Sequence, residues 1–205
     1  MGSLANIAAA RDALVRDLLA DGVGDPIGDV NWTYDVSGCR VDATQQAGVI
    51  VMGFNAGSGG RGSEMRWKGE CERLTADIEG GYMLAELILI SSHDIGDLRQ
   101  RQLDVGRLIA RCAAVNMAVI AYHRPRVILQ TGLGYLDAIS AAYGLKRVVE
   151  VPRPDHPRDR LLRHHLMSDG TPWLSIKHPS SFGFSRLDLE AIRSYVRNAC
   201  GVGLL

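Results

Sequence analysis

The sequence of 205 residues has no excess of charge of either sign, because 23 Lys and Arg balance 23 Asp and Glu. A neutral chain exerts no general attraction on nucleic acid, although this balance is compatible with a local basic patch. No apolar run reaches the roughly 20 residues that a membrane span needs, and the N-terminal segment lacks the apolar region of a signal peptide. We therefore expect a cytoplasmic protein that contacts no membrane. Its length predicts one domain over residues 1–205, and we expect a monomer.

Cysteines are few and far apart, and no two of them form a CxxC pair. This spacing argues against a compact zinc site or an iron–sulfur ligand set. We expect free thiols that are buried or half-buried, and we expect neither a metal nor a cofactor. The four cysteines are Cys39, Cys71, Cys112 and Cys200.

Nucleotide-binding and hydrolase motifs are missing or incomplete. The P-loop pattern GxxxxGK[ST] is absent, and the run AGSGG does not satisfy the GxSxG of a nucleophile elbow. Residues 57–62, GSGGRG, match GxGxxG, but they start several residues after the predicted strand and no clear helix start follows them. A nucleotide- or cofactor-binding α/β enzyme therefore stays an alternative, but not the favoured one.

Hydrophobic periodicity predicts strands that alternate with helices, which indicates a mostly parallel sheet covered by helices. Helices are expected over 4–20, 68–80, 100–123, 133–143 and 187–199. Buried strands are expected over 48–53, 85–91, 126–132 and 172–178, with a further short extended piece over 146–151. Residues 152–165 are polar and basic, and they suit either a solvated helix face or phosphate contacts.

Polar residues collect where three of these strands end. The ends read Gly53-Phe54-Asn55, Ser91-Ser92-His93-Asp94 and His178-Pro179-Ser180. In an open α/β sheet the ligand lies outside the carboxyl ends of the strands. The sequence therefore predicts a binding or catalytic site at this edge.

Two of these loops together resemble motifs of the uracil-DNA glycosylase superfamily. GFNAG after the first strand and HPSSFGFS after the last take the places of that family's G-x-[D/N]-P-[G/Y] and H-P-S loops, and HRPRVILQTGLG resembles its third strand. The resemblance covers roughly residues 48–185. It implies an α/β fold of three layers, with a central four-stranded parallel sheet of order 2-1-3-4 flanked by helices.

The resemblance also implies a reaction, hydrolysis of the N-glycosidic bond of a nucleotide flipped out of DNA. His178 would donate a hydrogen bond to the departing base, and Asn55 would hold the water or the base where more reactive members have Asp. The implied base pocket comprises Gly53, Phe54, Ala56, Gly57, Trp67, Ser91, Ser92 and His93, with Phe54, Trp67 or Trp32 stacking on the base. The implied DNA contacts are Ser180, Ser181, Phe182 and Phe184, with core packing as the alternative role of each Phe. Arg158 and Arg163 of the basic segment are further candidates for DNA contacts, because their charge suits phosphates.

The sequence departs from the family where uracil is selected. Ala56 replaces a proline, and Gly57 replaces the tyrosine that blocks substituents at C5 of the base. The second strand ends in Ser91-Ser92-His93, where uracil-specific members place an asparagine. We therefore expect a glycosylase whose pocket admits C5-modified bases, such as a hypermodified viral cytosine in antiviral defence. A uracil or mismatch repair glycosylase and a non-catalytic nucleic-acid-binding module are the alternatives.

Overall fold

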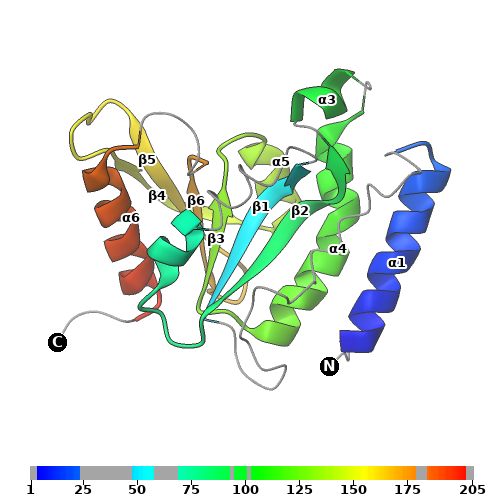
Figure 1. Ribbon diagram of the computed structural model, residues 1–205, viewed down its shortest axis with the longest axis horizontal. Helices are drawn as coiled ribbons and strands as arrows, with labels where there is room; N and C mark the ends of the chain where they lie inside the picture. Colours follow the sequence, from blue (N-terminus) through cyan, green and yellow to red (C-terminus); the bar gives the residue numbers. More distant parts are fainter. Residues whose placement is uncertain are drawn as a thin grey trace.

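The structure is a computed structural model that describes residues 4–23, 48–57, 69–92, 95–100, 103–178 and 184–201. Its helices are α1 (Leu4–Ala20), α3 (Ile95–Gln100), α4 (Val105–His123), α5 (Leu136–Tyr143) and α6 (Arg186–Ala199), and residues 69–75 are helical as well. Its strands are β1 (Val49–Gly57), β2 (Tyr82–Ser92), β3 (Val127–Thr131), β4 (Lys146–Pro152), β5 (Arg160–Leu166) and β6 (Pro172–Ile176). Figure 1 shows the strands as one twisted sheet with helices on both sides.

The sheet has six strands in the order β2-β1-β3-β6-β5-β4, so the predicted α/β class is confirmed and the predicted four-stranded parallel sheet is wrong. Strands β2, β1, β3 and β6 are parallel to one another, whereas β5 pairs antiparallel with β6 and β4 pairs antiparallel with β5. The prediction missed β5 because its charged and histidine residues gave the segment a polar composition. Leu161 and Leu162 are nevertheless fully buried, and they hold β5 in the sheet.

One face of the sheet packs against α4, α1 and α5, and we call it the α4 side. Side chains alternate along a strand, so Ile50 and Met52 of β1 point to this face together with Trp173 of β6. Helix α4 supplies Ile109, Cys112 and further apolar residues from one stripe. Its start is capped by Asp104, whose carboxylate accepts from the Arg107 N–H at 3.0 Å. The cap explains why the predicted helix over 100–123 begins only at Val105.

The opposite face packs against α6 and the 69–75 helix, and we call it the α6 side. Val49 and Val51 of β1, with Leu174 and Ile176 of β6, meet Ile192 and Val196 of α6 there. Figure 1 shows α6 and the 69–75 helix together on this side, with α1 and α4 on the other. Both faces are covered, which explains the nearly continuous apolar runs of β1 and β3.

Helix α4 is the one helix of the described residues that is long and apolar enough to cross a membrane by length and composition. Half of the relevant window is buried inside the fold. The core helix of a globular protein passes the same test, so this feature is only weak support for a membrane span.

Candidate functional site at the carboxyl edge of the sheet

Strand register brings the two resemblance motifs into one row at the carboxyl edge. Met52 pairs with Gln130, and Gln130 pairs with Ser175, so β1 and β6 are aligned through β3. Asn55 lies three residues after Met52 on β1, and His178 lies three residues after Ser175, just beyond the end of β6. Adjacent strands lie about 4.8 Å apart, so β1 and β6 are roughly 10 Å apart where both pair with β3.

Strand β3, which lies between them, ends at Thr131, one residue beyond the level of Gln130. The Gly132 N–H donates to the Ile176 carbonyl at 2.7 Å, and Gly132 has a φ of 107°, which favours glycine. The end of β3 is fixed further by Gln130, whose amide nitrogen donates to the Gly132 carbonyl and whose oxygen accepts from Trp173 and Ser175. This buried network holds the backbone from which His178 projects.

Asn55 lies inside β1, not in a loop after it, because β1 and β2 continue to pair up to Gly57 and Ser92. Asn55 pairs with Ile88, but Gly57 pairs with Ser92, so β2 contains extra residues at this point. Such an irregularity re-aims the neighbouring side chains and is common beside active sites. The structure describes Asn55, Ala56, Gly57, Ser91 and Ser92 by their backbone only.

His178 is half-buried, and desolvation lowers the pKa of its imidazole from the ordinary value. The ring is therefore neutral at pH 7 and carries one N–H donor. A neutral imidazole can donate to a developing anion without giving up its proton.

Gly53, which was predicted to lie in the base pocket, makes room for a neighbouring side chain. It pairs with Glu86 on β2, and a side chain at position 53 would put its Cβ 2.2 Å from Oε2 of Glu86. Glycine at this position makes room for a carboxylate that is only 9% exposed. Sequence reasoning missed Glu86, although it is the one charged residue in the apolar run AELILIS.

Phe54 points to the α4 side, opposite to Val51 and Gly53, and packs against Tyr135 with ring centroids 5.6 Å apart. Arg99 donates from Nε to the Tyr135 hydroxyl at 2.7 Å, and its guanidinium lies 5.3 Å from the centre of the Tyr135 ring. These contacts support a packing role for Phe54. Phe184 is partly buried against the core of the α6 side.

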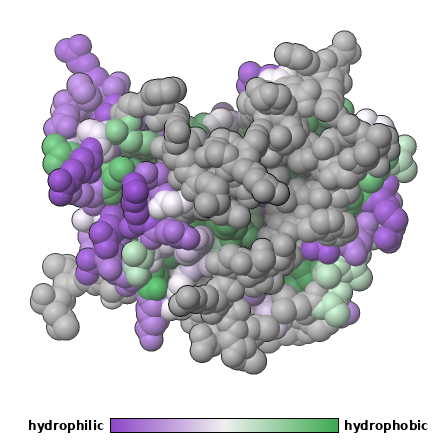
Figure 2. Space-filling view, in the orientation of Figure 1, coloured by the Kyte–Doolittle hydropathy of each residue, from purple (hydrophilic) through white to green (hydrophobic). Residues whose placement is uncertain are grey.

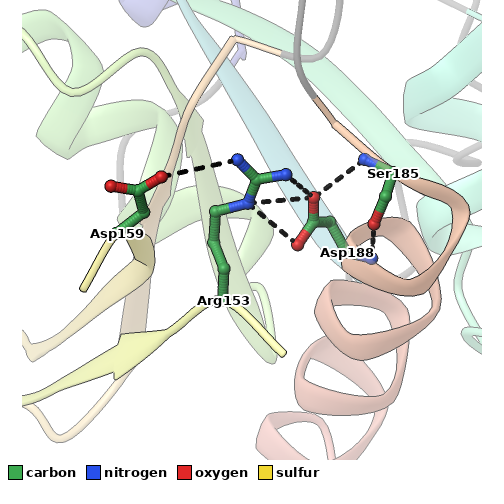
Figure 3. A network of polar contacts seen from close by, with 4 residues as sticks. All are labelled: Arg153, Asp159, Ser185 and Asp188. Carbon is green, nitrogen blue, oxygen red and sulfur yellow. Dashed lines mark hydrogen bonds and ion pairs between the residues drawn. The ribbon is translucent and has the colours of Figure 1, made fainter. Parts of the chain in front are cut away.

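A buried ion pair between Arg153 and Asp188 lies at the start of α6 (Figure 3). The Asp188 carboxylate is fully buried and accepts from Nε of Arg153 at 3.1 Å and from Nη2 at 2.5 Å. It also accepts from the Ser185 N–H at 2.8 Å, and Ser185 Oγ accepts from the Asp188 N–H at 3.1 Å, which completes a capping box at the start of α6. Burial raises the pKa of Asp188, but the bonds from Arg153 and Ser185 outweigh it, so the pKa is lowered overall.

The predicted basic contacts lie on the β4–β5 hairpin. Arg163 pairs with Glu150 at 2.7 Å and is mostly covered, and Arg160 pairs with the same carboxylate at 2.9 Å. Arg158 is exposed in the turn between the strands. Figure 2 shows hydrophilic side chains gathered over the part of the molecule where Figure 1 places α6 and this hairpin. Arg158 is therefore better placed than Arg163 to meet a ligand.

Several predicted residues lie outside the described part of the chain. These are Trp32, Trp67, His93, Ser180, Ser181 and Phe182.

Cysteines in the described ranges are free and buried, as predicted. Burial, followed by the nearby charge of Glu86, raises the pKa of Cys71 to about 12, and burial raises the pKa of Cys112 and of Cys200 to about 11. These thiols are protonated at neutral pH. Within the described ranges, no group of three or more His, Cys, Asp or Glu is arranged to hold a metal ion.

No family model matches the chain, and no curated protein matches it in sequence. Any assignment of function therefore depends on the residues at the carboxyl edge and on their geometry.

Proposed function

We propose that the protein is a DNA glycosylase that takes a flipped base between β1 and β6 and hydrolyses its N-glycosidic bond. The observation that carries this proposal is that Asn55 of β1 and His178, two residues after the end of β6, each lie three residues beyond one level of strand pairing, with only β3 between the two strands. An asparagine and a neutral imidazole at one edge of the sheet suit a reaction in which an anion leaves and water attacks.

In the proposed reaction the bond between C1′ of the sugar and the base nitrogen breaks, and its electron pair goes to the base. Negative charge then develops on the base oxygen, and His178 donates its N–H to that oxygen. One such donor is worth about 3 kcal/mol in transition-state stabilisation. Asn55 holds the water that attacks the cation-like C1′, and that water releases a proton to solvent. Asparagine cannot remove this proton, so the rate depends on positioning.

The substrate class in this proposal is a base with a substituent at C5. It follows from Gly57, a residue without a side chain two positions after the proposed catalytic asparagine. A hypermodified cytosine of viral DNA fits this class, which would make the protein a defence enzyme. A repair enzyme for uracil or mismatched bases would use the same bond-breaking residues.

The test uses oligonucleotides that carry uracil, thymine opposite guanine, 5-hydroxymethylcytosine or glucosylated 5-hydroxymethylcytosine, followed by hot alkali to cut at abasic sites. His178→Ala and Asn55→Ala should each abolish cutting. His156→Ala and Asn198→Ala change the same residue types at exposed positions of the hairpin and of α6, and they should keep it. If wild-type protein binds DNA but cuts no oligonucleotide, the glycosylase proposal is wrong and a binding module is favoured.

A further inference from the structure

A buried carboxylate lies one strand away from the proposed catalytic asparagine. Glu86 sits on β2, and its side chain crosses over Gly53 of β1, where a Cβ would lie 2.8 Å from its Cδ. Gly53 precedes Asn55 by two residues, so Glu86 occupies the row directly below the proposed catalytic row. Rows two residues apart along a strand are separated by about 7 Å.

Glu86 faces the α6 side, because Gly53 continues the alternation of Val49 and Val51. Leu174 and Ile176 of β6 point to the same side, and His178 lies two residues after Ile176, beyond the end of the strand. Cys71 of the 69–75 helix is buried with Val49 and Val51 on this side, and the negative charge of Glu86 contributes to the raised pKa of Cys71. The carboxylate therefore lies on the α6 side of the sheet, near the edge where the chain leaves β6 towards His178.

The backbone of Glu86 is held from the opposite side of the sheet. Asn116 of α4, which is 1% exposed, donates from Nδ2 to the Glu86 carbonyl at 2.9 Å and to the Tyr143 hydroxyl at 2.8 Å. Asn116 Nδ2 also lies 3.4 Å from the Leu87 carbonyl, so this buried amide fixes the backbone of β2 at two successive residues. The Glu86 side chain therefore starts from a fixed backbone, and recognition needs a preorganised partner.

An ionised carboxylate only accepts hydrogen bonds, and its two oxygens can accept about four of them. It can therefore serve a ligand in addition to a protein donor. Cytosine offers a donor, its N4 amino group, where uracil and thymine have the acceptor O4. Glu86 would thus attract cytosine and repel the oxygen of uracil.

The dimensions are compatible with one pyrimidine. The Glu86 carboxylate lies over Gly53 of β1, two strand spacings across the sheet and one row below the level of His178, so the two positions are roughly 12 Å apart. A pyrimidine that accepts from His178 through O2 and donates to Glu86 through its amino group spans roughly 10 Å, counting two hydrogen bonds of about 2.9 Å, and the length of the imidazole side chain covers the remainder.

We infer that Glu86 is the residue that selects the base, and that it selects pyrimidines with an exocyclic amino group, the cytosine class, over uracil and thymine. This inference rests on the proposed glycosylase function and sharpens it. Gly57 would then admit the C5 substituent, while Glu86 reads position 4.

The experiment compares two substrates that differ only at position 4, 5-hydroxymethylcytosine and 5-hydroxymethyluracil, in differently labelled oligonucleotides within one reaction. If the wild-type protein cuts neither hydroxymethyl base, the cytosine and uracil forms are both made with a C5 substituent that the wild-type protein does cut. We expect wild-type protein to prefer the cytosine form and Glu86→Gln to lower that preference by about 10-fold to 100-fold. The ratio of the two rates does not depend on how much of the variant is folded. Glu190→Gln, an exposed position on α6, is the control and should leave the ratio unchanged.

The outcomes separate this inference from the proposed function. Cutting that favours the uracil form, or a preference that Glu86→Gln leaves intact, overturns the role of Glu86 and keeps the glycosylase. No cutting of any oligonucleotide by wild-type protein overturns both. If Glu86→Gln shows no activity at all, Gly53→Ala is used in its place. The added methyl group displaces the carboxylate, so the ratio of the cutting rates for the cytosine and uracil forms should fall. An unchanged ratio overturns the inference.

Discussion

Replacing Asp188 by alanine should destabilise the protein strongly, because it leaves the guanidinium of Arg153 without its main partner. The two side chains are 0% and 12% exposed, so water replaces the lost contacts poorly. Removing one partner of a buried ion pair costs about 3–5 kcal/mol. For a chain of this size that corresponds to a decrease in Tm of about 6–20 °C. Thermal unfolding followed by circular dichroism measures the change.

Two controls show whether the effect comes from the buried pair. Glu190→Ala breaks the exposed Arg186–Glu190 pair of the same helix, and we expect it to cost less than about 1 kcal/mol. Ser185→Ala removes only the hydroxyl of the capping box and should cost about 1 kcal/mol. The reasoning is refuted if Asp188→Ala lowers Tm no more than Glu190→Ala does.

Three further predictions concern buried polar groups. Desolvation lowers the pKa of four histidines in the folded protein, so these groups bind protons more readily in the unfolded chain as the pH falls below about 6.5. The free energy of unfolding should therefore decrease as the pH is lowered from 7 to 5. Urea titrations at each pH measure this free energy, and a constant value would contradict the assignment. The four histidines are His123, His164, His165 and His178. Changing Cys39 to serine should leave thiols that react with a maleimide only after denaturant is added, whereas rapid labelling of native protein would show that they are accessible. Gln130→Leu should lower the free energy of unfolding by about 1–3 kcal/mol, because it leaves the Trp173 indole N–H and the Ser175 hydroxyl without their acceptor. Urea unfolding monitored by tryptophan fluorescence measures the change, and an unchanged midpoint would show that the network is dispensable.

Helices and parallel strands were predictable from local pattern. The apolar stripe of α1 and the continuous apolar runs of β1 and β3 depend on residues that are neighbours in sequence. Strand β5 was not predictable in this way. Its Arg and His residues mask two buried leucines, and its place in the sheet depends on pairing with β6 and β4.

The candidate site, like the fold, could be predicted from the sequence only in part. Short motifs were enough to single out Asn55 and His178, because their residue types and the strands before them are visible in the sequence. The same motifs placed Gly53 in the base pocket, and the structure adds that the missing side chain of Gly53 makes room for Glu86. Arg163 was expected to contact phosphates, and it pairs with Glu150.

Sequence by itself determined the α/β class, the buried free thiols and the candidates at the strand ends, because each follows from residue type and local periodicity. Only the tertiary structure decided the six-stranded mixed sheet, the buried pair of Arg153 and Asp188, and the position of Glu86 over Gly53. Each of these joins segments that are distant in sequence. Tertiary packing determines whether a charged side chain is exposed, paired or held beside a site. A local sequence pattern does not contain this information, because the packing residues are distant in sequence.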